Sequence, residues 1–514
     1  MNGAESLVRT LMSSGVDTCF ANPGTSEIHL VQALDGIPEM RCVLGLFEGV
    51  VTGAADGYAR MARKPASTLL HLGPGLGNGL ANLHNASRAQ VPILNVVGQH
   101  ATNHLQHDTP LCSDVEGIAR PYSRWLRTSQ SSSSLGRDAA EAIASARTAP
   151  GQISTLIVPA DVGWSDGGCI SARIDPPPPP AVAPSSIDQA LAMLRSGLPT
   201  ALLLSGNALF GEGLKAAACI AAKTGARLFC PYPLTRLERG TGLPAVERVM
   251  YVLEQGIEQF KPFRQLILVG AQAPMAYFAY PGKSTSFTSP DCEIHVLAKA
   301  NEDRVGALKA LEENLEYSAA HSIQRNAERP TIPSGPITLP GLAATVGALL
   351  PENAIVVDES MTSGRGMMGA TKNAPPHDWL GNTGGSIGIA LPLAVGAAVA
   401  CPNRRVLCLT ADGSGMYTLQ ALWTMARESL KVTTVVFANR DYAVLKREFS
   451  YLGVGEPGPR ALDMFEIGRP DLDWVHLARG MGVSARRVSS LEDFASALQN
   501  GFESAGPNLI EVPL

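Results

Sequence analysis

Two side chains with oxygen ligands follow apolar runs in the last third of the chain. Asp412 comes shortly after the run 405–410, and Asn439 comes directly after the run 433–438. The carboxyl ends of neighbouring parallel strands meet at one edge of a sheet, so we expect these side chains to lie together. A carboxylate, an amide oxygen and a backbone carbonyl beside a diphosphate suit Mg²⁺, which takes few protein oxygens.

The residues after Asp412 favour the same chemistry. Gly413 lets the backbone approach a ligand closely, and Ser414 can cap the following helix, whose start favours a phosphate. An ordinary strand, turn and helix with an Asp cap and an Asn turn would leave the same pattern. These residues alone therefore leave both interpretations open.

Two proline-rich segments divide the chain. Five consecutive prolines occupy 176–180, and a second proline-rich segment covers about 328–340. The first can form neither a helix nor a central strand. At roughly 150 residues per domain, the chain should hold about three domains. We predict them at 1–174, 186–327 and 338–514.

Each of the three parts alternates short apolar runs with helical stretches. The runs are continuous rather than alternating, which is typical of parallel strands covered on both faces. We expect strands at 18–21, 67–71, 93–97, 200–204, 227–230, 265–269, 354–358, 405–410 and 433–438. The predicted fold class is α/β, with three doubly wound parallel-sheet domains.

The pattern at Asp412 and Asn439 resembles the cofactor motif of thiamine diphosphate (ThDP) enzymes, in which an acidic strand end precedes an Asn by some twenty-seven residues. Ala411 stands where the family usually has glycine, and Ala438 stands where it has the first of two asparagines. The resemblance implies ThDP and Mg²⁺ as cofactors. It also implies that Asp412 and Asn439 bind the metal, with the carbonyl of Asp441 as the third ligand.

The segment 42–60 resembles the part of the same family that contains its catalytic glutamate, which here is Glu48. The resemblance implies that this carboxylate hydrogen-bonds the aminopyrimidine ring of ThDP and favours the tautomer that gives the nucleophilic ylid. A helix cap or a surface glutamate is the alternative.

Two other segments of the first domain resemble the family. In 22–27, the residue after Pro-Gly faces the substrate in the family, and here it is Thr25. The segment 71–78 is similar to the glycine-rich loop, with His71 at the strand end. The resemblance implies that His71 orients the substrate carboxylate or relays a proton.

The third part carries further matches. The segment 358–363 resembles the loop that hydrogen-bonds the diphosphate, with Thr362 as the donor. Ile387 matches the bulky apolar residue that holds the cofactor bent, and Gly413 and Ser414 would lie beside the diphosphate. The resemblance thus implies a pyrimidine-binding first domain, a central domain and a diphosphate-binding third domain.

The sequence resembles two members of the family that catalyse different reactions. Acetolactate synthase large subunits resemble the whole chain, but Pro110 and Leu111 replace an aromatic residue and a glutamine. Benzoylformate decarboxylase resembles the pocket, but 276–280 has aromatic residues and no histidine. We expect a ThDP- and Mg²⁺-dependent, acetolactate synthase-like enzyme that decarboxylates 2-oxo acids to an enamine and then performs carboligation. A decarboxylase releasing an aldehyde and a non-catalytic paralogue are the alternatives.

The resemblance also implies partners. Active sites between subunits imply a homodimer or homotetramer acting on a small 2-oxo acid, and FAD is not expected because the central part is short. The net charge of −5 argues against nucleic acid.

Several sequence features concern location and other ligands. No apolar run is long enough for a membrane span, and the start of the chain lacks a signal peptide pattern, so we expect a cytoplasmic protein with reduced, buried cysteines. The glycine-rich stretch 73–79 lacks the spacing of an NAD site, and His100, His104 and His107 favour a solvated loop over a zinc site.

Overall fold

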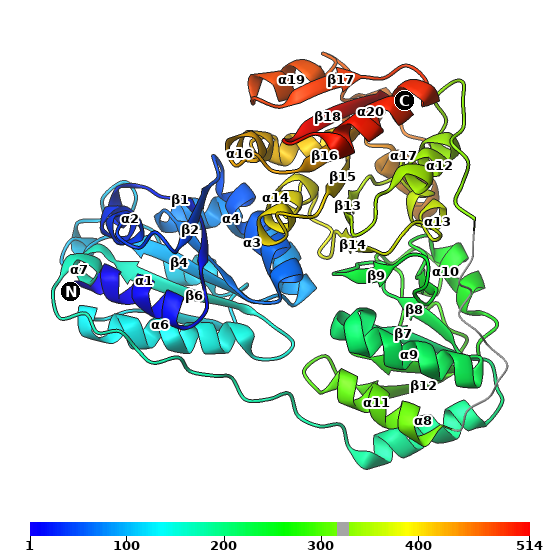
Figure 1. The fold of residues 1–514 in the computed structure, drawn as a ribbon, viewed down its shortest axis with the longest axis horizontal. Coiled ribbons are helices and arrows are strands. Elements are labelled where there is room, and N and C mark those ends of the chain that lie inside the picture. Colours follow the sequence, from blue (N-terminus) through cyan, green and yellow to red (C-terminus); the bar gives the residue numbers. More distant parts are fainter. Residues whose placement is uncertain (316–327) are drawn as a thin grey trace.

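The computed structural model describes residues 1–315 and 328–514 and contains three sheets with helices packed on them (Figure 1). The predicted fold class of three parallel-sheet α/β domains is confirmed. One antiparallel edge strand in the third sheet is an addition to that prediction. The predicted domain limits stay a proposal.

The first sheet has six parallel strands. Their order is β2 (Arg41–Leu44), β1 (Thr18–Asn22), β3 (Ala66–Leu70), β4 (Ile93–Gln99), β6 (Ile153–Pro159) and β5 (Trp125–Thr128). The helices of this region are α1 (Gly3–Ser13), α2 (Ile28–Asp35), α3 (Glu48–Ala62), α4 (Leu72–Ala89), α5 (Val115–Ala119), α6 (Ser132–Arg147) and α7 (Ala160–Trp164). Strands β3 and β4, which were predicted, are buried along their whole length, and so is β6, which was not predicted.

The second sheet has five parallel strands. Their order is β10 (Val246–Arg248), β8 (Arg227–Cys230), β7 (Thr200–Leu204), β11 (Gln265–Val269) and β12 (Glu293–Ala298). The helices here are α8 (Pro184–Arg195), α9 (Gly211–Thr224), α10 (Leu253–Phe260) and α11 (Arg304–Asn314). The three predicted strands of this part have the observed bounds, because each is an apolar run between turn residues.

The third sheet has seven strands. Their order is β17 (Ser484–Arg487), β18 (Asn508–Pro513), β16 (Val432–Ala438), β15 (Val406–Ala411), β13 (Ile355–Glu359), β14 (His377–Gly381) and β9 (Leu237–Arg239). The helices are α12 (Leu339–Leu349), α13 (Met367–Ala370), α14 (Ala390–Ala400), α15 (Asp412–Gly415), α16 (Ala421–Arg427), α17 (Ala443–Leu452), α18 (Pro459–Phe465), α19 (Trp474–Gly480) and α20 (Leu491–Glu503). Strand β9 comes from the central part of the sequence and pairs antiparallel with β14.

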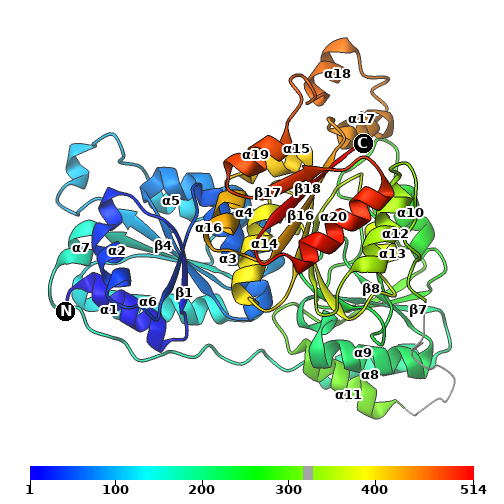
Figure 2. The same cartoon turned by 45° about the horizontal axis from the view of Figure 1, so that its top comes forward.

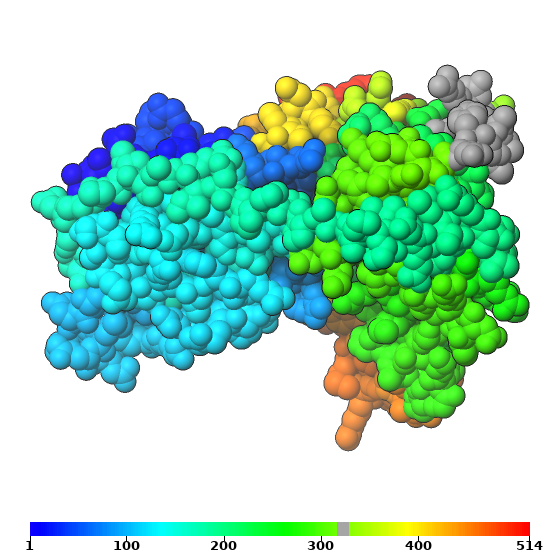
Figure 3. All heavy atoms as spheres, turned by 90° about the horizontal axis from the view of Figure 1, so that it is seen from below, coloured from blue at the N-terminus to red at the C-terminus, as the bar shows by residue number. Residues whose placement is uncertain are grey.

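The segment around the first proline run is an extended connection between lobes. Residues 167–183 form neither helix nor strand, and they cross from the first to the central lobe (Figures 1 and 3). All nine cysteines are free thiols. The expectation that they are buried is wrong for Cys42, Cys169 and Cys219, which are exposed; Cys219 lies on the solvent side of α9.

Helices α3 and α14 connect the first and third sheets. A Cβ atom at Gly57 would overlap the carbonyl of Leu393, and one at Gly396 would overlap the carbonyl of Ala54. The two helix backbones are therefore in direct contact. The small residues of 48–61 allow this contact, and both helices belong to one hydrophobic core shared by the first and third sheets.

Candidate functional site

Asp412 and Asn439, two of the predicted metal ligands, lie together at the carboxyl end of the third sheet. They follow β15 and β16, which pair with each other in parallel. Asp412 is buried and begins α15. Its Oδ1 accepts from the backbone N–H of Gly413 at 2.9 Å, and its Oδ2 accepts from the N–H of Arg440 at 2.7 Å. Burial raises the pKa of this carboxyl, although both N–H groups oppose the rise.

Asn439 and Asp441 follow β16 directly. The Oδ1 of Asn439 accepts from the N–H of Asp441 at 3.3 Å, and the Asp441 carboxylate pairs with Lys446 at 2.5 Å. Within the described residues, Oδ1 of Asp441 is buried without a hydrogen-bond partner. Each Asp412 oxygen accepts one hydrogen bond and keeps further lone pairs. These oxygens fit a hard cation such as Mg²⁺.

Residues Gly413 and Ser414 lie inside α15 rather than before it. Ala411 is the extended residue that precedes the helix, and Asp412 is its first residue. The prediction that Ser414 caps a helix start is therefore wrong, because Asp412 itself takes the first free N–H group. A Cβ atom at Gly413 would approach the ring of Tyr442 to 2.7 Å, so only glycine leaves room there.

Glu48 begins α3 and is buried. Its Oε2 accepts from Nδ2 of Asn78 on α4 at 3.0 Å. Gly75 on the same helix faces the other oxygen, and a Cβ atom there would lie 3.1 Å from Oε1 and 3.4 Å from Cβ of His71. Glu48 and His71 therefore lie on either side of Gly75.

The glycine-rich stretch is helical. Helix α4 begins at Leu72, and His71 is the residue before it, so the expected loop at 71–78 is wrong beyond its first residue. Leu72 is buried and has φ of +52°, an uncommon conformation for a leucine. Next to this backbone turn, the ring of His71 contacts Glu27, in the turn that follows β1.

His71 has a buried carboxylate partner that the sequence analysis missed. Its Nδ1 lies 2.7 Å from Oε2 of Glu27, which also accepts from the N–H of Gly24 at 2.8 Å. Glu27 is fully buried, and this burial raises its pKa. The spacing from Gly24 to Glu27, typical of a capping box, was the available signal. Thr25, in the same turn, is exposed.

A second missed carboxylate supports the loop that carries Ile387. Glu359, at the end of β13, accepts from the N–H groups of Gly388 and Ala390 at 3.1 Å and from Nδ2 of Asn382 at 3.0 Å. Complete burial raises the pKa of Glu359 to about 7. Ile387 itself is half-buried at the third-sheet edge.

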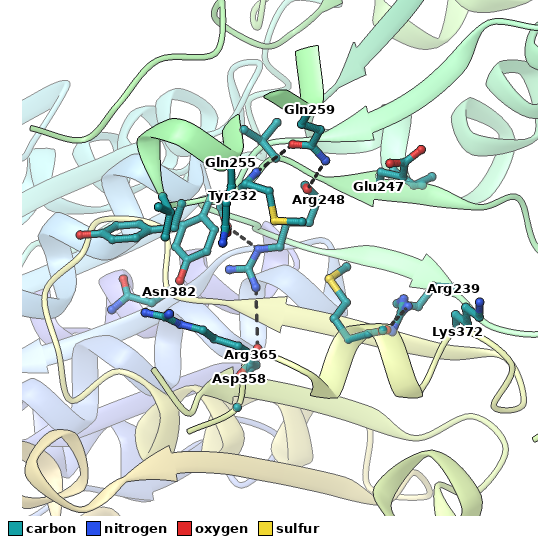
Figure 4. A pocket seen from close by; sticks show the side chains of 18 of the residues that line it. Tyr232, Arg239, Glu247, Arg248, Gln255, Gln259, Asp358, Arg365, Lys372 and Asn382 are labelled. Carbon is teal, nitrogen blue, oxygen red and sulfur yellow. Dashed lines mark hydrogen bonds and ion pairs between the residues drawn. The ribbon is translucent and has the colours of Figure 1, made fainter. Parts of the chain in front are cut away.

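Thr362 borders two hollows. The smaller, of about 440 Å³, is also lined by Ser363 and Asn439, so the predicted diphosphate donor and one predicted metal ligand share it. The larger is a cavity of about 1630 Å³ between the central and third sheets. In Figure 4, Arg248 reaches across this cavity from the central lobe to Asp358.

The cavity divides the predicted site residues into two groups. Its lining starts at Ala218 and ends at Leu452, so none of the described residues of the first sheet contributes to it. Thr25, Glu48 and His71 therefore form one group, around α3 and α4. The other group, at the carboxyl end of the third sheet, contains Thr362, Ile387, Asp412, Gly413, Ser414, Asn439 and Asp441. Among the described residues, neither of the two hollows is lined by members of both groups.

The remaining predictions concern the histidines at 100–107 and membrane-spanning segments. The rings of His100 and His104 are 5.7 Å apart and those of His104 and His107 are 5.4 Å apart. Over residues 1–315 and 328–514, no three His, Cys, Asp or Glu side chains gather as metal ligands would. In the same residues, no helix has the length and hydropathy to cross a membrane.

Two family descriptions match the chain. "Thiamine pyrophosphate enzyme, N-terminal TPP binding domain" matches residues 1–117, and "Thiamine pyrophosphate enzyme, C-terminal TPP binding domain" matches residues 363–512. The two matches contain both groups of predicted site residues, apart from Thr362, which directly precedes the second.

Full-length relatives are also similar. A Mycobacterium tuberculosis protein named "Putative acetolactate synthase large subunit IlvX" is 52% identical, over 100% of this chain and 99% of that protein. Benzoylformate decarboxylase of Pseudomonas aeruginosa is 27% identical, over 98% of this chain and 97% of that protein. The solved structure of the ThDP-dependent 4-hydroxybenzoylformate decarboxylase of Rhodococcus jostii RHA1 covers 100% of this chain and 99% of its own, with a TM-score of 0.87 and 23% identity.

Proposed function

This chain belongs to the ThDP-dependent enzyme family, and we propose that it is an acetolactate synthase-like carboligase that requires Mg²⁺ and uses 2-oxo acids. Its whole length is similar to proteins of the acetolactate synthase and benzoylformate decarboxylase types. It is an enzyme, so the non-catalytic alternative is set aside.

The residues at the carboxyl end of the third sheet suit the diphosphate and metal end of the cofactor. Asp412, Asn439 and the carbonyl of Asp441 would hold Mg²⁺, since they offer three oxygens at neighbouring strand ends. Gly413 and Ser414 would line the phosphate groups with backbone N–H groups of a helix start.

Two further residues complete that end. Thr362 would donate to the diphosphate, because it borders the same hollow as Asn439. Ile387 would pack against the rings of ThDP, on a loop that Glu359 holds through the N–H groups of Gly388 and Ala390. When bound, ThDP supplies a carbon nucleophile and accepts the electron pair left by carbon dioxide.

Glu48 carries this proposal. It is buried, its Oε2 is oriented by Asn78, and its Oε1 faces a glycine that leaves room for a ligand. A carboxylate fixed in this way can hold a proton against a ring nitrogen and return it. His71, beyond Gly75, would orient the substrate or pass a proton, with Glu27 as its partner, and Thr25 would face the substrate.

The complete site would need two chains. The cavity that contains Thr362 has no lining residue from the first sheet of the same chain. Glu48 would therefore reach the cavity of a second copy, in a homodimer or homotetramer. We also propose a cytoplasmic location, which the nine free thiols support because cysteines stay reduced there.

A decarboxylase that releases an aldehyde is the second candidate. The observation in its favour is the pair of Glu27 and His71, joined at 2.7 Å, because an imidazole held by a buried carboxylate can deliver a proton. Proton delivery ends the reaction at an aldehyde, whereas attack on a second carbonyl compound gives a ligated product.

Product identification separates the two candidates. The purified chain is incubated with ThDP, Mg²⁺ and pyruvate, and in parallel with benzoylformate. Acetolactate from pyruvate supports the carboligase, and an aldehyde without ligated product supports the decarboxylase. If neither acid loses carbon dioxide while ThDP binds, the proposed use of these 2-oxo acids is wrong.

A further inference from the structure

The large cavity has an unusual polar wall on α17, a helix that projects with α18 from the third lobe (Figure 2). Arg447 and Glu448 of this helix both line the cavity. The guanidinium of Arg447 lies over the ring of Tyr251, 5.5 Å from its centre. Glu448 accepts from the hydroxyl of Tyr280 at 2.9 Å.

Arg447 is short of partners. In the part of the chain that the structure describes, its Nε and Nη1 are buried and make no hydrogen bond. Its ion pair with Glu448 is long, at 3.6 Å. A buried N–H donor that is left unpaired is costly, so two of them beside a cavity indicate a ligand with acceptor oxygens.

Another arginine of the cavity shows the contrast. Arg248 donates through Nε to the carbonyl of Tyr232 at 2.9 Å, stacks on the Tyr232 ring at 4.1 Å and pairs with Asp358. Its side chain is held by the protein itself. Arg447 therefore differs from Arg248 in being available to a ligand.

The chemistry of decarboxylation limits which group Arg447 can hold. The reacting carboxylate loses its charge as carbon dioxide leaves, so a guanidinium bound to it would stabilise the substrate more than the transition state. A carboxylate that survives the reaction carries no such penalty. Such a group is the distal carboxylate of a dicarboxylic 2-oxo acid, or the carboxylate of an acceptor.

We propose that Arg447 is a specificity-determining residue that binds a carboxylate retained in the reaction. The enzyme then prefers a donor or an acceptor that carries such a group over one that lacks it. This proposal rests on the proposed function for the reaction, but not on its outcome as ligation or aldehyde release. Glu448 limits the charge of the wall, so a single carboxylate is accommodated beside Arg447 and an additional anion is repelled.

The donor arm of the test measures carbon dioxide release. Release from 2-oxoglutarate is compared with release from 2-oxobutyrate, as a ratio of kcat/KM values. We expect Arg447→Met to lower this ratio roughly 10- to 100-fold, as for loss of a buried charged hydrogen bond, and mainly through KM. Arg447→Lys should keep part of the preference. Glu448→Gln should raise the ratio, because it removes a neighbouring negative charge.

The acceptor arm uses pyruvate as donor with either glyoxylate or propanal as acceptor, and measures the ratio of ligated products. A fall in this ratio alone in Arg447→Met assigns the retained carboxylate to the acceptor. Arg365→Met removes the same charge from an exposed residue of the cavity lining, and should change either ratio by less than about threefold. Unchanged ratios in both arms overturn the proposal.

A binding measurement keeps the proposal separate from turnover. Glutarate, which cannot react, is titrated calorimetrically into the chain with ThDP and Mg²⁺, with butyrate as reference. We expect glutarate to bind more tightly than butyrate, and Arg447→Met to remove the difference. Equal binding of both acids by the unaltered chain overturns the proposal, whereas absence of carbon dioxide release alone overturns only the proposed function.

Discussion

The buried carboxylates Glu27 and Glu48, near α3 and α4, differ from Asp412 and Glu359, at the carboxyl end of the third sheet, in what they accept hydrogen bonds from. Glu48 is held by the Asn78 side chain, and Glu27 by the His71 ring as well as by one backbone N–H. Asp412 is held by backbone N–H groups alone.

Glu359 extends this contrast, since two of its three partners are the N–H groups of Gly388 and Ala390. Backbone donors fix a carboxylate at one point of the fold, which suits a metal ligand or a loop support. Side-chain partners can rotate, and the ring of His71 offers a second nitrogen that can donate or accept a hydrogen bond. Glu27 and Glu48 thus suit proton transfer, whereas Asp412 and Glu359 suit holding a group in place.

The largest effect is expected at Glu48. Glu48→Gln keeps an oxygen for the Asn78 bond but cannot exchange the proton, so we expect turnover to fall roughly 1000-fold. Carbon dioxide release is measured, with ThDP binding followed by calorimetry. The exposed Glu39→Gln is the control. Turnover near that of the unaltered chain would contradict a proton role for the first-sheet group.

The next effect concerns stability and pH. Burial raises the pKa of Glu359 from its ordinary 4.5 to about 7, so between these values the folded chain holds a proton that the unfolded chain releases. Stability from this group therefore decreases as pH rises through that window, by about 3 kcal/mol. Glu359→Gln should flatten the loss of Tm between pH 5 and pH 8, relative to the exposed Glu352→Gln. If Tm falls equally with pH in the two variants, Glu359 is not the cause of the pH-dependent loss of stability.

A smaller effect is expected at the metal ligands. Asp412→Asn removes the charged ligand proposed for Mg²⁺, and we expect the Kd of ThDP with Mg²⁺ to rise by more than about 100-fold. Asp441→Asn is the matched control, because only its backbone carbonyl is a proposed ligand, and loss of its half-buried pairing with Lys446 should matter less than about threefold. Similar losses in both variants would show that local charge, not ligation, decides binding.

The smallest effect should come from Glu27. Glu27→Gln weakens the bond to His71, and we expect turnover to fall about tenfold. If Glu27 acts through His71, the double variant with His71→Gln should be no slower than His71→Gln alone. Additive losses would assign Glu27 a separate role.

The sequence alone was enough for the nine predicted strands, because apolar runs such as 200–204 and 265–269 are buried on both faces and their ends are marked by turn residues. It did not predict other strands of the same sheets, such as β6 and β18. Motif residues such as Asp412 and Asn439 were also predictable, since strand ends bring them together. Glu27 was not, because its pairing with His71 depends on β1 and β3 being neighbours.

Two other features depended on tertiary structure. Strand β9 has charged residues and no apolar run, and only its pairing with β14 makes it a strand. The start of α15 at Asp412, rather than near Ser414, is a shift of two residues that side-chain preferences do not resolve.

Strand β9 has a consequence for protein engineering. Residues 237–239 belong by sequence to the central part, yet they cover the β14 edge of the third sheet, where Trp379 pairs with Leu237. A chimera that exchanged 186–327 for the equivalent part of a relative would therefore replace an edge strand of the third sheet as well. A graft without a matching strand would expose a row of backbone donors and acceptors, and such a bare edge promotes aggregation.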